Sequence, residues 1–221
     1  MNAAQELVIR IDPENRRIRL ENQDSGITHY KEISAEGLMD SFRQSIRTEG
    51  VQSGFLPPNC FHVEIQSDKS KVYCLWHPSL YADISYYGTE YVHFPLPRLV
   101  FGFHISPEGK VRSCKLGVIA DEKPTVETPM FHYPFSNVGG FRLCTGNNAL
   151  PVYKKPHTLA TLPDFLLRLP NNNDSLHQIY NKLQLPYREL LNHLKDKEPS
   201  YYYSDILVSN GKCLSDFISG R

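Results

Sequence analysis

The stretch LVFGFHISPEGKVRSCKLGVIA, residues 99–120, carries the strongest fold signal in this chain. Two runs rich in aromatic and β-branched residues, 99–105 and 111–120, flank a turn-forming segment at 106–110 that contains a proline and a glycine. Two such runs joined by a short loop with glycine are typical of a β-hairpin. The stretch therefore predicts two adjacent antiparallel strands.

A second hairpin is predicted upstream, with its turn near residues 68–69. Apolar and polar residues alternate on both sides of this turn, and the apolar positions are Phe61, Val63, Ile65, Val72, Cys74 and Trp76. Placing Phe61 opposite Trp76 and Val63 opposite Cys74 puts all of these side chains on one face. Because one face of a sheet is normally buried, this register is the predicted one.

The first residues of the chain predict a β extension over 1–34. Apolar residues alternate with polar ones at Leu7, Ile9 and Ile11, and the alternation resumes at Ile18 and Leu20 after a turn. Period-two alternation on both sides of a turn indicates an extra N-terminal β-hairpin. A third strand is expected near residues 28–33.

Helical patterns lie in the middle and at the end of the chain. Ser34 precedes residues 35–47, where apolar residues recur at helical spacing, so we expect a helix that Ser34 caps. Residues 176–183 and the leucines at 190, 191 and 194 show the same spacing, and Pro186 should end or kink the helix between them. The segment from 134 to about Pro163 shows no regular pattern, and the run 171–175 predicts a turn.

The order of these elements predicts an α+β fold, because strands and helices do not alternate as they do in βαβ units. The expected architecture is an antiparallel β-meander with flanking helices, preceded by the extra β-hairpin. We therefore expect the β extension over residues 1–34 and one further domain over 35–221, with helices at its C-terminal end.

Composition excludes several functional classes. The 221 residues include 24 basic and 24 acidic side chains, so the net charge is zero and a nucleic-acid partner is not expected. No apolar run approaches the roughly 20 residues that cross a bilayer, and no signal peptide is visible, so no membrane association is expected. Five cysteines without a clustered framework indicate reduced thiols, and hence a cytoplasmic protein. Nothing indicates the oligomeric state.

Few motifs indicate a cofactor or metal. Cys60, His62, Cys74 and His77 have zinc-like spacing. However, Cys60 and His62 should share a face, whereas Cys74 and His77 should face opposite sides of an extended strand. No phosphate-binding glycine motif occurs. We therefore expect neither a metal nor a cofactor.

Cys144 is the strongest candidate for a reactive thiol. It lies outside the predicted strands and helices and is flanked by Gly139-Gly140 and Gly146, so it should be exposed. Arg142 adds local positive charge, which favours a thiolate. On these local features alone, a reactive thiol and an inert loop cysteine both remain open.

The segment from Phe131 to Cys144, FHYPFSNVGGFRLC, resembles the active-site stretch of ubiquitin-conjugating enzymes. More specifically, the pieces 99–106, 123–129, 134–138 and 143–147 are similar, in order and spacing, to a prokaryotic branch called family D. That branch includes protein B of PRTRC cassettes, which are plasmid-type operons. From the first to the last, these pieces span about a quarter of the chain. The resemblance implies the ubiquitin-conjugating fold.

The resemblance to ubiquitin-conjugating enzymes also implies roles for three residues. Cys144 would carry a small ubiquitin-like modifier as a thioester, Asn137 would stabilise the oxyanion formed during transfer, and His132 would belong to the same site. The family's compact His-Pro-Asn tripeptide is replaced here by His132-Tyr133-Pro134, with Asn137 three residues on. The implied partners are a modifier and an activating-enzyme-like protein, and the implied chemistry needs no cofactor and no metal.

Two other functions are compatible with the sequence. The conjugating fold could serve as an inactive protein–protein interaction module of a plasmid or mobile-element cassette, with Cys144 incidental. A buried Cys144 without a neighbouring groove would favour that alternative. A thiol hydrolase would instead place a histidine ring, oriented by a carboxylate, within hydrogen-bond reach of the Cys144 sulfur.

Overall fold

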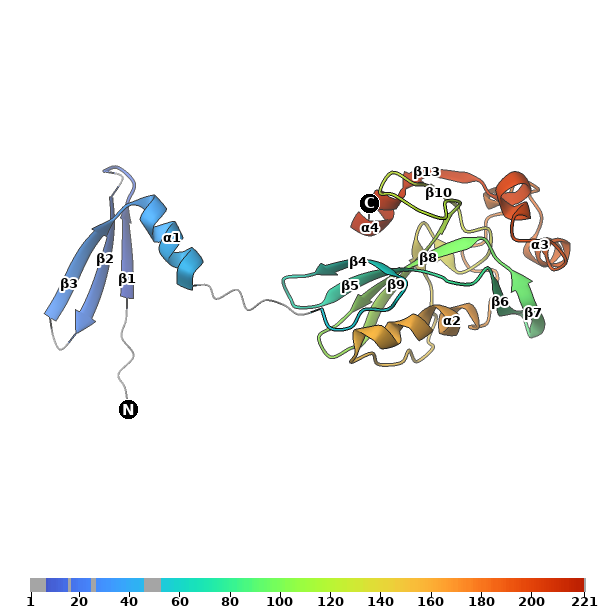
Figure 1. The fold of residues 1–221 in the computed structure, drawn as a ribbon, viewed down its shortest axis with the longest axis horizontal. Helices are drawn as coiled ribbons and strands as arrows, with labels where there is room; N and C mark the ends of the chain where they lie inside the picture. The colour runs from blue at the N-terminus through green and yellow to red at the C-terminus, as the bar shows by residue number, and fades with distance from the viewer. Residues whose placement is uncertain (1–6, 16, 25–26, 46–52, 221) are drawn as a thin grey trace. The chain divides into compact units, whose positions relative to one another are not determined.

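The computed structural model describes residues 7–15, 17–24, 27–45 and 53–220. Backbone contacts divide the chain into two compact units, Met1–Gln52 and Ser53–Arg221 (Figure 1). Helix α1, Ala35–Ser45, is thereby grouped with the N-terminal strands. The predicted division between residues 34 and 35 stays a prediction.

The first unit is a three-stranded antiparallel sheet followed by α1. Its strands are β1 (Leu7–Asp12), β2 (Arg17–Asp24) and β3 (Ile27–Ile33), in the order β1-β2-β3. The predicted hairpin and third strand are therefore confirmed. The Ser34 hydroxyl accepts a hydrogen bond from the Gly37 amide at 3.0 Å, which confirms the predicted cap. The predicted end of the helix at Arg47 lies outside the described residues.

The main sheet of the second unit has the strand order β11-β12-β9-β8-β5-β4. Strand β10 extends it by pairing with both β9 and β13, and β6 and β7 form a separate hairpin. The bounds are β4 Cys60–Ile65, β5 Lys71–Trp76, β6 Tyr81–Tyr86, β7 Thr89–Pro95, β8 Arg98–Ile105, β9 Val111–Ile119, β10 Pro129–Phe131, β11 Val138–Gly139, β12 Arg142–Leu143 and β13 Ser209–Cys213.

The hairpin of β8 and β9 forms the centre of this sheet, as the 99–120 stretch predicts. Phe101 lies opposite Leu116, and both side chains are buried in the larger core. Gly117 lies on the other face, where a Cβ atom would lie 2.3 Å from the end of the Met130 side chain and 3.2 Å from Phe217, so a larger residue would force these side chains to shift. The absence of side-chain bulk at Gly117 thus lets Phe217 pack closely on the sheet.

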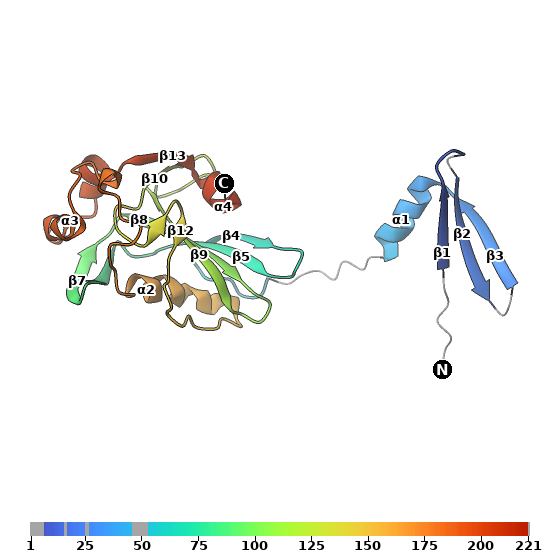
Figure 2. The ribbon, with the colours of Figure 1, turned by 180° about the vertical axis from the view of Figure 1, so that it is seen from behind.

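Helices cover both faces of the sheet (Figures 1 and 2). Helix α2 (Leu162–Leu167) contributes to the larger core on one face, and α4 (Leu214–Ser219) covers the smaller cluster on the other. The remaining helices are α3 (Tyr187–Leu194) and the short helices at Pro156–Thr161, Gln178–Tyr180 and Tyr202–Ile206. The α+β class and the antiparallel meander with flanking helices are therefore confirmed.

The predicted register of β4 and β5 is wrong by one residue. Val63 lies opposite Tyr73 instead of Cys74, because the hairpin turn closes with Gln66 bonded to Ser70. A β-bulge between Cys60 and His62 then shifts the far end of β4 by one further residue. Val63 consequently packs against the larger core. Cys60 and His62 lie opposite adjacent residues of β5, so the expectation that they share a face is also wrong.

The helix predicted from the pattern at residues 176–183 is also wrong. The segment forms only the short helix Gln178–Tyr180, and the backbone of Gln184 is left-handed, with φ of 52°. The fully buried Asn181 bonds the carbonyl oxygens of Gln178 and Leu185 and accepts from the Leu185 amide, so it organises a loop instead of a helix. The predicted helical pattern at Leu190, Leu191 and Leu194 is confirmed, since these residues lie in helix α3, which begins directly after Pro186.

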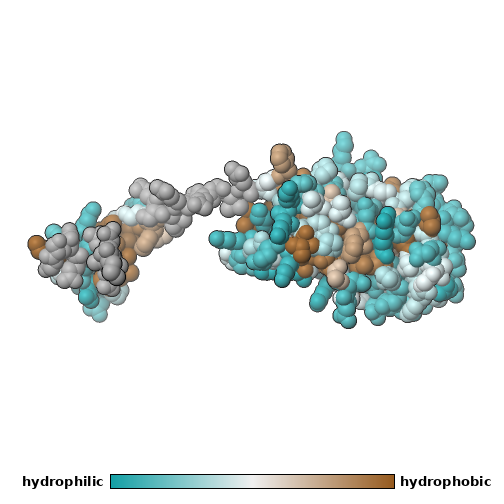
Figure 3. Space-filling view, turned by 90° about the horizontal axis from the view of Figure 1, so that it is seen from below, coloured by the Kyte–Doolittle hydropathy of each residue, from teal (hydrophilic) through white to brown (hydrophobic). Residues whose placement is uncertain are grey.

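The surfaces of both units mix polar and hydrophobic residues (Figure 3). In the first unit Ile18 is buried, whereas Leu7, Ile11 and Ile27 are exposed. In the second unit Phe55 is 87% exposed. Across the described residues, no helix is long and apolar enough to cross a membrane.

A buried histidine at the end of β5 forms a hydrogen bond with helix α2. The His77 ring is bonded through Nδ1 to the Ser79 carbonyl at 2.6 Å and through Nε2 to the Asp164 carboxylate at 2.9 Å. The His77 side chain is 1% exposed, so Nε2 has little access to water. Asp164 lies in the first turn of α2 and thus links the helix to the sheet.

We expect Asp164→Ala to destabilise the second unit by about 1–3 kcal/mol, because it leaves a buried ring nitrogen without a partner. Asp164→Asn should cost less, since its amide can still bond Nε2. Urea unfolding curves of both variants and the wild type test this. Equal midpoints for Asp164→Ala and the wild type would show that the contact contributes nothing to stability.

Candidate functional site

Cys144 lies at the end of a tight hairpin on the edge of the main sheet. Val138 pairs with Leu143 across the hairpin, and Leu143 pairs in turn with Cys114 of β9. Gly140 makes the turn possible because its φ is 62°, a conformation that glycine adopts without strain. The chain leaves the sheet immediately afterwards, and the Cys144 side chain is exposed, as predicted.

A groove of about 400 Å³ lies beside Cys144. Its lining residues come from β9, from the hairpin, from the loop that follows Cys144 and from the 171–175 turn, and include Arg112, Ser113, Gly139, Gly146 and Ser175. Most of these residues are small, which leaves room for an extended chain segment. Cys144 is therefore both exposed and next to a concave surface.

The buried cysteines differ from Cys144 in their surroundings. Burial raises the pKa of Cys74 and of Cys114 to about 12, because an ionised thiol loses its hydration there. Burial also raises the pKa of Cys60. These three thiols stay protonated and unreactive at neutral pH.

Asn137 and Cys144 are brought together by the same hairpin. The Cys144 amide donates to the Asn137 carbonyl at 2.7 Å, which extends the pairing of Val138 with Leu143 by one step. Asn137 has a left-handed backbone with φ of 66°, which asparagine tolerates better than most residues. Both residues also line a small cavity of about 20 Å³ behind the hairpin.

His132 lies elsewhere. Its ring stacks on Tyr180 with a centroid distance of 3.9 Å, and its backbone amide donates to the Val208 carbonyl at 2.9 Å. It lines neither the groove nor the small cavity beside Cys144. Burial, followed by the nearby charge of His177, lowers the pKa of His132, so it is uncharged at neutral pH.

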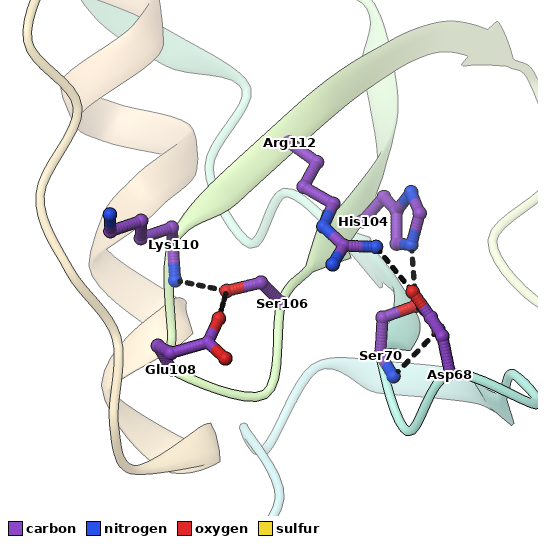
Figure 4. Close-up of polar contacts among 7 residues, drawn as sticks. All are labelled: Asp68, Ser70, His104, Ser106, Glu108, Lys110 and Arg112. Carbon is purple, nitrogen blue, oxygen red and sulfur yellow. Dashed lines mark hydrogen bonds and ion pairs between the residues drawn. The ribbon is translucent and has the colours of Figure 1, made fainter.

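A network of polar side chains joins the tips of the β4–β5 and β8–β9 hairpins (Figure 4). Ser70 is fully buried, and its hydroxyl donates to Asp68 at 2.5 Å and contacts His104 Nε2 at 2.7 Å. The other Asp68 oxygen accepts from Arg112 at 2.6 Å. Because Arg112 also lines the groove, this network fixes one wall of the site. No local motif predicts it, since it joins residues far apart in sequence.

The network should make stability sensitive to acid. Hydrogen bonds from Ser70, together with Arg112, hold the pKa of Asp68 well below its usual range. A lowered pKa in the folded state adds stability above the unfolded value of about 3.9, and that stability is lost as pH falls toward the folded value. We therefore expect Asp68→Asn to be less stable than the wild type at pH 6, with a smaller loss of stability between pH 4 and pH 2. Thermal unfolding between pH 6 and pH 2 measures how the stability of each protein changes with pH. The same pH dependence in Asp68→Asn and the wild type would contradict the lowered pKa of Asp68.

The structure gives no support for a histidine-assisted thiol. Within the described ranges, no side chain forms a hydrogen bond with the Cys144 sulfur, so no histidine and carboxylate are arranged around it. In the same part of the chain, no group of three or more His, Cys, Asp or Glu side chains could hold a metal ion. Cys74 is buried and His77 binds Asp164, so the four zinc-like residues do not converge.

An antiparallel meander that leads into a short hairpin with an exposed cysteine is compatible with an E2-like fold, that is, the fold of ubiquitin-conjugating enzymes. The chain belongs to prokaryotic E2 family D, whose family model matches residues 34–209, more than half of the chain. A search of the curated proteins and of the solved structures found no match. Membership places the chain in a bacterial context and in ubiquitin-like conjugation, where E2-like proteins interact with modifiers and with activating-enzyme-like proteins.

Proposed function

We propose that this protein is a ubiquitin-like conjugating enzyme that carries a small modifier on Cys144 and transfers it to an acceptor. The exposure of Cys144 beside a groove, in a chain of E2 family D, is the observation that carries the proposal. Exposure lets the thiol reach a partner protein, and the groove offers a place for the tail of the modifier. A buried Cys144 would have favoured an interaction module without activity.

The chemistry needs two acyl transfers. The Cys144 thiolate attacks the carbonyl carbon of the modifier thioester on the activating enzyme, and the thiolate of that enzyme leaves. An acceptor amine then attacks the same carbonyl carbon, an amide bond forms, the Cys144 thiolate leaves, and the amine loses a proton. Both steps pass through a tetrahedral oxyanion. No redox partner is consumed.

Asn137 supplies the group for oxyanion stabilisation in this proposal. Its backbone lies opposite Cys144, and its side-chain amide carries two N–H bonds, one of which is directed at Asn171. The second N–H remains to donate to the oxyanion. A single donor of this kind changes the rate by about 10²–10³. His132 takes no direct part in this scheme, because it lines neither cavity at Cys144.

The proposed partners follow from the family. We propose that the modifier and an activating-enzyme-like protein are encoded with this chain in a PRTRC-type cassette, and that the reaction takes place in the cytoplasm. All five cysteines are free, which suits a reducing compartment.

Reconstitution tests the proposal. The full chain is mixed with the activating-enzyme-like protein and the ubiquitin-like modifier that are proposed to be encoded beside it, with and without ATP. The products are analysed on gels with and without reductant. We expect an ATP-dependent adduct that reductant removes. If the three proteins bind one another but form no adduct, the interaction module is the better description.

A further inference from the structure

The asparagine run at 171–173 has a second role besides making a turn. Asn171 lies 34 residues from Asn137 in sequence, yet its side-chain oxygen accepts from the Asn137 amide nitrogen at 3.3 Å. The same oxygen accepts from the Ser136 hydroxyl at 3.4 Å. Asn171 therefore contacts two consecutive residues of the segment that leads to the Cys144 hairpin.

The orientation of the Asn171 amide is determined by its other contacts. Its Nδ2 atom donates to the carbonyl oxygens of Ser85, at 3.1 Å, and Leu169, at 3.4 Å. Both partners can only accept, so Nδ2 must face them and Oδ1 must face Asn137. Because Asn171 Oδ1 can only accept, the NH2 group of Asn137 must face it.

The backbone of this turn is also fixed on both sides. The Asn171 amide donates to the Ser85 carbonyl at 2.9 Å, and the Asn171 carbonyl accepts from Tyr87 at 3.3 Å. Three residues on, the Asp174 carbonyl accepts the Asn137 amide at 2.7 Å. The turn thus connects the β6–β7 hairpin to the backbone beside Cys144.

We propose that Asn171 is a positioning residue: it holds the Asn137 side chain with its NH2 group, and not its oxygen, available to the oxyanion at Cys144. This inference rests on the proposed function. A free asparagine amide rotates between two nearly equivalent orientations, and one of them would present an oxygen to a developing negative charge. The bond to Asn171 removes that orientation.

A double-mutant cycle tests the inference on the full chain. Cys144 is charged with a peptide bearing a C-terminal thioester of 2-mercaptoethanesulfonate, and discharge to free lysine is followed by mass spectrometry. We expect Asn137→Ala to slow discharge by about 10². Asn171→Ala should slow it about tenfold, and the double variant should be no slower than Asn137→Ala alone.

The matched control is Asn173→Ala, which stays in the same turn and loses only the described bond from the Tyr86 hydroxyl. We expect its discharge rate within about twofold of the wild type. If Asn171→Ala still slows discharge tenfold in the Asn137→Ala background, Asn171 affects the rate without acting through Asn137. That result would overturn the inference.

A second measurement does not depend on activity. In ¹⁵N spectra the Asn137 side-chain NH2 signals, assigned by their absence in Asn137→Ala, should shift in Asn171→Ala and stay in place in Asn173→Ala. Unchanged signals in Asn171→Ala would overturn the inference. If the wild type takes up no acyl group from the peptide thioester, the proposed function fails. If the wild type is active but the effects of Asn137→Ala and Asn171→Ala add, only the inference about Asn171 fails.

Discussion

Replacing Cys144 by alanine is expected to abolish the reductant-labile adduct completely. The thioester forms on the sulfur atom itself, and alanine offers no nucleophile in its place. The other cysteines do not substitute, because burial keeps Cys60, Cys74 and Cys114 protonated. The measurement is the adduct band in the reconstituted reaction with the modifier, the activating-enzyme-like protein and ATP.

Two controls accompany this variant. Cys213→Ala removes a half-buried thiol of β13 and should leave the adduct unchanged. The stability of Cys144→Ala should lie within about 0.5 kcal/mol of the wild type, because Cys144 is exposed and its substitution leaves no cavity. An adduct that persists in Cys144→Ala would place the acyl group on another residue and contradict the proposed site.

Phe135→Ala is expected to destabilise the second unit by about 3–5 kcal/mol. Phe135 is 1% exposed, and its ring contacts four other aromatic rings, those of Phe94, Tyr133, Tyr187 and Tyr202, at centroid distances of 5.3–6.2 Å. Truncation leaves a cavity that these large rings fill only in part. Since whole domains are stable by about 5–15 kcal/mol, this change removes a large share of the total.

Phe55→Ala is the matched control, because the same atoms are removed from a side chain that is 87% exposed. We expect it to change the free energy of unfolding by no more than about 0.5 kcal/mol. Urea unfolding at equilibrium measures both variants. Equal midpoints for the two would show that the aromatic cluster around Phe135 is not a stabilising core. Phe135→Ala should also lower adduct formation, since Ser136 and Asn137 follow it directly in the chain.

Local signals predicted the parts of the fold that depend on neighbours in sequence. The β8–β9 hairpin follows from two strand-forming runs around one turn, and the start of α1 follows from the Ser34 side chain. Local alternation does not predict the β6–β7 hairpin, because a bulge places one extra residue between Tyr91 and Phe94 of β7, opposite Ala82 and Ile84, and interrupts the alternation in that strand.

The candidate site was predictable only in part for the same reason. The glycines around Cys144 indicate an exposed thiol, and the short distance in sequence to Asn137 brings these two residues into one hairpin. For Asn171 the sequence predicts only a turn, because its bond to Asn137 spans 34 residues and leaves no local pattern. The Asp68 network spans 44 residues between Asp68 and Arg112 and was missed likewise.

By itself the sequence determined the antiparallel hairpins, the capped helix and an exposed cysteine in a glycine-rich segment, because turns, caps and alternation are properties of adjacent residues. Tertiary structure alone decided the bulge that shifts β4 against β5, the loop around the buried Asn181, and the bond from Asn171 to Asn137. These features depend on which distant side chains and backbone groups must share buried space and find hydrogen-bond partners there.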